Sequence, residues 1–208
     1  MSDSELVDLC VNLAKIPQLR KFIFIVDADN PERTKKIIDQ NNPFKFLGNN
    51  VYSLQIPVPE HRTNSAICIE HYYTDSELRT EKEIAGKRCR LFLGNEFDNR
   101  GISLDREYHC TAPRQCGPDK ITIIDGDSKT KVTLISDPQV SLALPKTKFA
   151  EALLNEENEF SDISSENFKL IFDILKQIIL PQEVTETPLT EQPAPGNAQQ
   201  GISSSIST

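Results

Sequence analysis

The chain has 208 residues, of which 38% are apolar, and 23 Lys and Arg against 31 Asp and Glu give a net charge of −8. This length fits one domain with its own core, and the acidic balance argues against a protein that coats nucleic acid through general basic charge. A local basic patch or a metal-bridged phosphate substrate stays compatible with that balance. The apolar runs are too short to cross a bilayer, and the acidic segment Met1–Glu5 does not resemble a signal peptide. Five widely spread cysteines suit reduced thiols, so we expect a cytoplasmic protein without membrane contact.

Helix and strand patterns alternate over the first part of the chain. They predict a helix from the Ser2-x-x-Glu5 capping box to Pro17, a strand over Phe22–Val26, a helix over Pro31–Gln40 and a strand over Val51–Ile56. The run Phe22–Val26 is apolar throughout, which is typical of a strand buried on both faces of a parallel sheet.

The later elements are shorter and mixed in type. They are a strand or helix start over Ala66–Tyr73, a short helix capped by Thr74-x-x-Glu77, a strand over Arg88–Leu93, a hairpin that joins Ile121–Ile124 to Lys131–Ile135 through Asp125-Gly126-Asp127, and helices over about 146–155 and 166–180. This order predicts an α/β fold with a parallel-sheet core, a β-rich insertion and C-terminal helices, in one domain of residues 1–180. Residues 181–208 contain no aromatic residue, Lys or Arg, and we expect a disordered tail there.

Two aspartates carry the strongest chemical signal. Asp27 and Asp29 follow the predicted strand Phe22–Val26, and ligands of open α/β sheets bind beyond the carboxyl ends of the strands. Two carboxylates on the same side repel each other unless a cation or a proton lies between them, and Mg²⁺ is the usual cation. The alternative is that both aspartates cap the helix that begins at Pro31.

A second acidic residue follows another apolar run. Glu70 comes after Ile67-Cys68-Ile69, and it would approach the aspartates if that run were the next parallel strand. The alternative is a surface glutamate at the start of a helix. His61 and His71 have no paired partner in the sequence, so a partly exposed structural role is favoured for each of them.

The segments FIFIVDADN (22–30) and IEHYY (69–73) resemble Toprim domains of the overcoming-lysogenization-defect nucleases, which are related to bacterial defence. In those domains a D-x-D motif ends a central strand and a later segment supplies another acidic residue. The family binds Mg²⁺ and cleaves nucleic-acid phosphodiesters. The resemblance implies that Asp27, Asp29 and Glu70 are catalytic, metal-binding carboxylates for Mg²⁺ or Mn²⁺. It also implies that Lys87 or Arg88 binds the phosphate of a nucleic acid.

The chain departs from the Toprim pattern ahead of Asp27. A Toprim domain begins with a strand that carries a catalytic glutamate, whereas the 26 residues before Asp27 supply one helix, with Glu5 in its capping box. Either the domain is N-terminally incomplete, or a partner protein supplies the missing strand, or the fold is different. In the first case two-metal phosphoryl chemistry would lack a ligand. We therefore expect a domain that descends from a nuclease but has weak or no activity as this chain alone.

Two other functions fit the same D-x-D motif. One is a non-catalytic Toprim-like module of a defence complex, which would bind a partner chain or nucleic acid without turnover. The other is a glycosyltransferase, since these enzymes also use D-x-D to hold a metal and a sugar nucleotide. The sequence contains none of the common nucleotide-loop or hydrolase-elbow motifs. Cys110-x₅-Cys116 misses the usual spacing of zinc ligands, so we expect small buried or loop thiols there.

Overall fold

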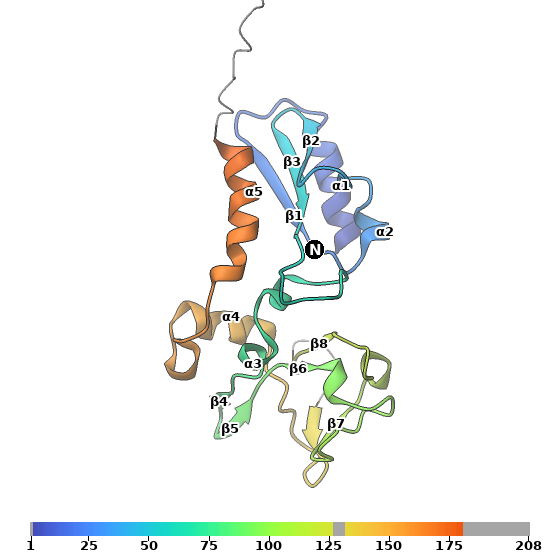
Figure 1. Cartoon of the computed structure of the whole chain (residues 1–208), viewed down its shortest axis with the longest axis vertical. Helices are drawn as coiled ribbons and strands as arrows, with labels where there is room; N and C mark the ends of the chain where they lie inside the picture. Colours follow the sequence, from blue (N-terminus) through green and yellow to red (C-terminus); the bar gives the residue numbers. More distant parts are fainter. Residues whose placement is uncertain (1, 127–131, 181–208) are drawn as a thin grey trace, which may run out of the picture.

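The computed structural model describes residues 2–126 and 132–180. Two expectations fall outside the described residues, namely the tail over 181–208 and the Asp127 side of the predicted hairpin turn. Figure 1 shows two regions along the long axis of the molecule, a sheet flanked by helices and a second region of small sheets. Among the described residues, no helix has both the length and the apolar character that a membrane span requires.

The first region is built from both ends of the described chain. Its elements are α1 (Asp3–Leu13), β1 (Phe22–Val26), α2 (Pro31–Thr34), β2 (Lys45–Gly48), β3 (Val51–Gln55) and α5 (Lys169–Ile179). The strand order is β1-β3-β2, with β1 parallel to β3 and β2 antiparallel to β3. The sheet is therefore mixed, and β1 lies at its edge.

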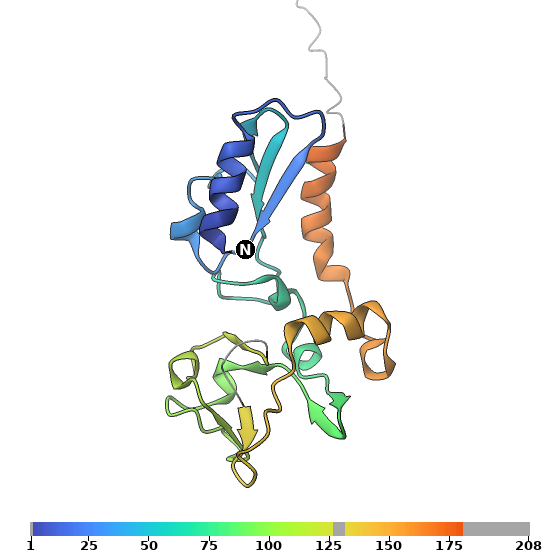
Figure 2. The same ribbon diagram turned by 180° about the vertical axis from the view of Figure 1, so that it is seen from behind.

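Alternating side chains of the strands place one helix layer on each face of this sheet. Phe24 and Val26 of β1 pack with Val7 of α1, while Leu54 of β3 packs with Ile174 of α5 on the other face. Figures 1 and 2 show the sheet between α1 and α5 from opposite sides. The result is a three-layer arrangement whose last layer comes from the far end of the described chain.

The second region holds short elements between β3 and α5. They are the 3₁₀ helices η1 (Ile69–Tyr72), η2 (Gly94–Glu96), η3 (Pro113–Gln115), η4 (Asn158–Phe160) and η5 (Glu166–Phe168), the helices α3 (Asp75–Leu78) and α4 (Lys146–Leu154), and the strands β4 (Lys82–Ile84), β5 (Lys87–Cys89), β6 (Phe92–Leu93), β7 (Tyr108–Cys110), β8 (Ile123–Ile124) and β9 (Val132–Leu134). Three two-stranded antiparallel sheets pair β4 with β5, β6 with β8 and β7 with β9. Leu91 and Leu93 enter one apolar cluster and Phe92 enters another, so this short stretch links both cores.

Several sequence expectations are confirmed. The capping boxes at Ser2 and Thr74 are both present at the starts of α1 and α3. The strand positions of β1 and β3 are as expected, and α4 begins at Lys146. The mixed α/β class is confirmed, because the described chain combines helices with a sheet that includes parallel pairing.

The expectation that β1 is buried on both faces is wrong for two of its residues. Phe22 and Ile25 each expose 40% of their surface. The reason is the position of β1 at the edge of the sheet. On the face of Ile25, α5 reaches Ile23 and packs mainly against β3 and its neighbours, while Phe22, the first residue of β1, lies on the opposite face with Phe24 and Val26.

Three other expected elements differ in extent or pairing. The helix after Pro31 ends at Thr34, because the Ile37 N–H bonds the carbonyl of Thr34, three residues back, at 2.9 Å and so turns the chain instead of continuing the helix. The expected strand over 88–93 is divided between β5 and β6. The hairpin is wrong, since Ile124 pairs with Phe92 of β6 and β9 pairs with β7, which buries both segments in the core.

Candidate functional site

Glu70 lies beside Asp27 at the carboxyl end of β1. The Ala28 N–H donates to the carbonyl of Ile67 at 2.8 Å, and the Ile69 N–H donates to Asp27 Oδ1 at 3.1 Å. These two bonds hold the start of η1 against the end of β1. The structure therefore brings the two acidic residues together, although Glu70 sits on a 3₁₀ helix rather than after a parallel strand.

The carboxylate of Asp27 is destabilised where it lies. Burial raises its pKa to about 6, and the charges of Glu70 and Asp29 add to that rise, against the opposing effects of the Ile69 N–H and Lys146. A carboxylate in this position gains from a proton or a cation close by. The alternative that Asp27 and Asp29 cap α2 has no support, because Asn30 is the N-cap residue and Asp27 accepts its hydrogen bond from η1.

Lys146 compensates the charge of Glu70. Its Nζ lies 2.8 Å from Glu70 Oε1, and the two side chains are 33% and 17% exposed. Burial alone would raise the pKa of Glu70, but the neighbouring Cys68 thiol and the Lys146 ammonium lower it below its usual value. The second oxygen, Glu70 Oε2, is buried and has no hydrogen-bond partner among the described residues.

The position of Lys146 in its helix is unfavourable on local grounds. It is the first residue of α4, where the positive end of the helix dipole disfavours a cation, and the first turn of α4 contains no acidic residue. The ion pair with Glu70 offsets this cost. Sequence reasoning missed Lys146, and a lysine at a helix N-terminus is the signal that could have found it.

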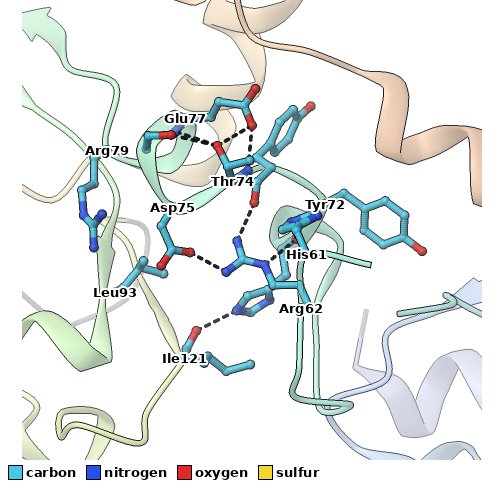
Figure 3. Close-up of polar contacts among 12 residues, drawn as sticks. His61, Arg62, Tyr72, Thr74, Asp75, Glu77, Arg79, Leu93 and Ile121 are labelled. Atoms are coloured by element: carbon cyan, nitrogen blue, oxygen red, sulfur yellow. Dashed lines mark hydrogen bonds and ion pairs between the residues drawn. The ribbon is translucent and has the colours of Figure 1, made fainter. Parts of the chain in front are cut away.

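Arg62 fixes the chain around η1. Its guanidinium donates to the carbonyls of His71 at 2.9 Å and Tyr73 at 2.5 Å, and it forms an ion pair with Asp75. Figure 3 shows Arg62 at the centre of these contacts, with His61 beside it. The side chain of Arg62 is only 10% exposed. Its contacts link the loop before η1 to the start of α3 and thereby hold Glu70 in place.

His71 has a structural role, as expected, but it is buried rather than partly exposed. Its Nδ1 accepts the Cys68 N–H at 3.1 Å, and its Nε2 donates to the carbonyl of Ile121 at 2.7 Å. Burial lowers the pKa of His71, which favours the neutral ring. Burial also raises the pKa of the Cys68 thiol, so this neighbouring pair does not form an activated nucleophile.

Lys87 and Arg88 are not at this site. They lie on β5 and line a cavity of about 350 Å³ together with Glu81 and Tyr108, and Arg88 forms an ion pair with Glu81 at 3.2 Å. Figure 1 shows β5 in the second region, away from the carboxyl end of β1. Lys87 and Arg88 therefore lie apart from the acidic residues beside which they were expected to bind a phosphate.

Cys110 and Cys116 are buried free thiols, as expected. All five cysteines, which fall within the described residues, are buried and free. Burial raises the pKa of Cys116 to about 12, which keeps this thiol protonated. A protonated, buried thiol suits packing in an apolar core.

Asp27 and Glu70 offer carboxylate oxygens of the kind that Mg²⁺ prefers. Asp27 supplies a carboxylate that a cation would stabilise, and Glu70 Oε2 is a buried acceptor without a partner. Mg²⁺ is bound by one or two carboxylates, with water and phosphate oxygens as its other ligands. Within residues 2–126 and 132–180, no group of three or more His, Cys, Asp or Glu side chains is arranged to hold a metal by itself. The site could therefore supply two protein ligands, with Asp29 close by.

No family model, curated protein or solved structure matches this chain. The geometry at the end of β1 is therefore the guide to function. Its distinguishing parts are the half-buried Asp27, the partner-free Glu70 Oε2 and the Lys146 ammonium.

Proposed function

We propose that this chain is a Toprim-like nuclease domain of a cytoplasmic protein, and that it uses Mg²⁺ or Mn²⁺ to cleave nucleic-acid phosphodiesters. The observation that carries the proposal is the arrival of Glu70 beside Asp27, with a buried oxygen that has no partner. A bound Mg²⁺ would polarise the phosphoryl group and lower the pKa of a coordinated water.

The residues of the chain take separate roles in this proposal. Asp27 and Glu70 hold the cation, and Asp29 adds negative charge at the rim of the site. Lys146 orients Glu70 and presents its ammonium to a phosphate oxygen, because its Nζ is already beside the carboxylates. Arg62 is a positioning residue, since it contacts the carbonyls that follow Glu70 and not the carboxylates themselves.

A second candidate function is a non-catalytic Toprim-like module that binds nucleic acid or a partner chain. The observation that favours it is the ion pair between Lys146 and Glu70, which gives one glutamate oxygen a cationic partner within the chain. In this case Lys146 takes the place that a metal occupies in an active site. Binding would then be independent of metal and no product would form.

Cleavage assays on the full chain distinguish these functions. Labelled single-stranded DNA, duplex DNA and RNA are incubated with Mg²⁺, with Mn²⁺ or with EDTA. For a nuclease, Asp27→Asn and Glu70→Gln each lower the metal-stimulated rate by about 100-fold or more, as expected for the loss of a metal ligand at the reacting phosphate. The matched control is Asp8→Asn, which removes an exposed carboxylate of α1 and leaves the rate unchanged.

Two results would reject the nuclease proposal. Cleavage that persists in the double variant Asp27→Asn/Glu70→Gln must come from another site or a contaminant. Metal-independent binding of nucleic acid without turnover, measured by fluorescence anisotropy, would instead support the non-catalytic module. In that case Lys146→Met should weaken binding more than Lys148→Met. The ammonium of Lys146 lies at the candidate site beside Glu70, whereas Lys148 on the same helix pairs with exposed Glu151.

A further inference from the structure

The outer edge of β1 faces away from β3, the strand with which β1 makes its only pairing among the described residues. On the inner edge, the Phe22 N–H donates to the carbonyl of Asn50 at 2.8 Å and the carbonyl of Val26 accepts the Ile56 N–H at 3.0 Å. Because hydrogen-bonding direction alternates along a strand, Ile23 and Ile25 direct their N–H and C=O groups to the other side. Within residues 2–126 and 132–180 no strand pairs with this side of β1.

This edge lacks the features that usually protect an exposed strand. β1 contains no proline and no charged residue, and its register with β3 is continuous over all five positions. Phe22 and Ile25 each leave 40% of their surface exposed along it. An edge whose outward backbone groups pair with no described strand, and which exposes apolar side chains, favours the addition of another strand.

The charges at the two ends of β1 indicate which strand would be added. Arg20 and Lys21 precede the strand, and Asp27 and Asp29 follow it. A parallel copy of this strand would bring like charges together, whereas an antiparallel copy brings the basic end to the acidic end. The segment is thus complementary to itself in the antiparallel direction.

We propose that β1 pairs antiparallel with β1 of a second copy of the chain, about a two-fold axis at Phe24. Ile23 of each copy then lies opposite Ile25 of the other, and each such pair exchanges two backbone hydrogen bonds. The three-stranded sheets join into one continuous sheet across the axis. This dimer does not depend on the proposed nuclease activity.

The same register sets Lys21 of one copy opposite Asp27 of the other. Both are odd-numbered positions of the strand and its extension, so their side chains project from the same face. In the single chain, Lys21 Nζ bonds the carbonyl of Ile178 at 2.6 Å, on the face that α5 covers. Each copy therefore brings the ammonium of Lys21 to Asp27 of the other copy. This cation would stabilise the carboxylate of Asp27, whose negative charge is disfavoured by burial and by the neighbouring carboxylates.

Sedimentation velocity and amide hydrogen exchange on the full chain test this pairing. We expect a concentration-dependent dimer in which the amides of Ile23 and Ile25 exchange more slowly than in the monomer. Ile25→Pro should weaken the dimer by about 10- to 100-fold, because it removes one outward N–H from each copy. Ile25→Val is the matched control, since it keeps the N–H and the β-branched shape, and it should dimerise nearly as well.

Proline at this position leaves the inner ladder intact, because the Ile25 N–H points away from β3; circular dichroism checks that the variant is folded. A charge exchange supplies an independent test. Lys21→Glu and Asp27→Lys should each weaken self-association, and an equimolar mixture of the two should form a heterodimer. The proposal is overturned if the wild-type chain stays monomeric up to about 100 μM, or if a dimer forms while the Ile23 and Ile25 amides exchange as fast as in the monomer.

Discussion

Replacing Asp27 with asparagine should stabilise the chain at alkaline pH. The asparagine keeps a side-chain oxygen that can accept the Ile69 N–H, and it removes a charge that burial and two neighbouring carboxylates disfavour. A rise in pKa from 3.8 to about 6 corresponds to about 3 kcal/mol of free energy of unfolding. Because water still reaches the half-buried side chain, we expect about 1–2 kcal/mol of this difference to be measured.

The sign of the effect depends on pH. The pKa of Asp27 is higher in the folded chain, so the folded state binds this proton more tightly than the unfolded state does. The contribution of Asp27 to stability is therefore full below pH 3.8 and is lost as the pH rises through about 6. Asp27→Asn should exceed the wild type in stability at pH 8 and lose this advantage at pH 4.

Urea unfolding of the full chain in EDTA, followed by circular dichroism at pH 4, 6 and 8, measures this difference. Asp8→Asn is the control, because Asp8 is exposed on α1 and its replacement should change stability by less than about 0.5 kcal/mol. If Asp27→Asn is less stable than the wild type at pH 8, the carboxylate is not destabilised and the reasoning fails. Added Mg²⁺ should raise the stability of the wild type and not that of Asp27→Asn, because a ligand stabilises only the state that binds it.

Substitutions at three further positions are each tested by urea unfolding, two of them beside the site and one in the second region. Lys146→Met should cost about 1–3 kcal/mol at pH 7, because Glu70 is left partly buried without its cation, and the loss should shrink as the pH falls below about 4.5 and Glu70 takes up a proton. Arg62→Met should cost about 2–4 kcal/mol and Arg62→Lys only slightly less, because neither side chain can reach two carbonyls and a carboxylate at once. Gly101→Ala should cost at least about 2 kcal/mol, since the added Cβ lies 2.4 Å from a backbone carbonyl oxygen at a φ of +83°. Gly86→Ala is its control, with a φ of +75° and open space around the Cβ, and an equal cost in both would show that the steric contact is unimportant.

The parts of the fold that the sequence predicts are those set by local chemistry. The capping boxes at Ser2 and Thr74 satisfy N–H groups within three residues, and the apolar run of β1 leads directly into Asp27. The approach of Glu70 to Asp27 follows from the two acidic residues that each end an apolar run. Their proximity was expected for a parallel strand and is instead produced by a 3₁₀ helix.

The missed parts depend on contacts between distant residues. Lys146 reaches Glu70 from a helix far along the chain, and Arg62 acts through carbonyl groups that no side-chain pattern reveals. Strands of two or three residues, such as β6 and β8, are too short to show a period in the sequence. The pairing of Ile124 with Phe92 was therefore mistaken for a local hairpin.

The placement of α5 has a consequence for the order in which the chain can fold during synthesis. The sheet is complete once β3 has been made, yet Leu54 is buried by Ile174 and Ile178, which follow only after the whole second region. Contacts of such long sequence separation form late, because the entropy of closing the intervening loop must be overcome first. A nascent chain that stops before α5 therefore presents an uncovered apolar face, and such a fragment should require chaperone protection until α5 has been synthesised.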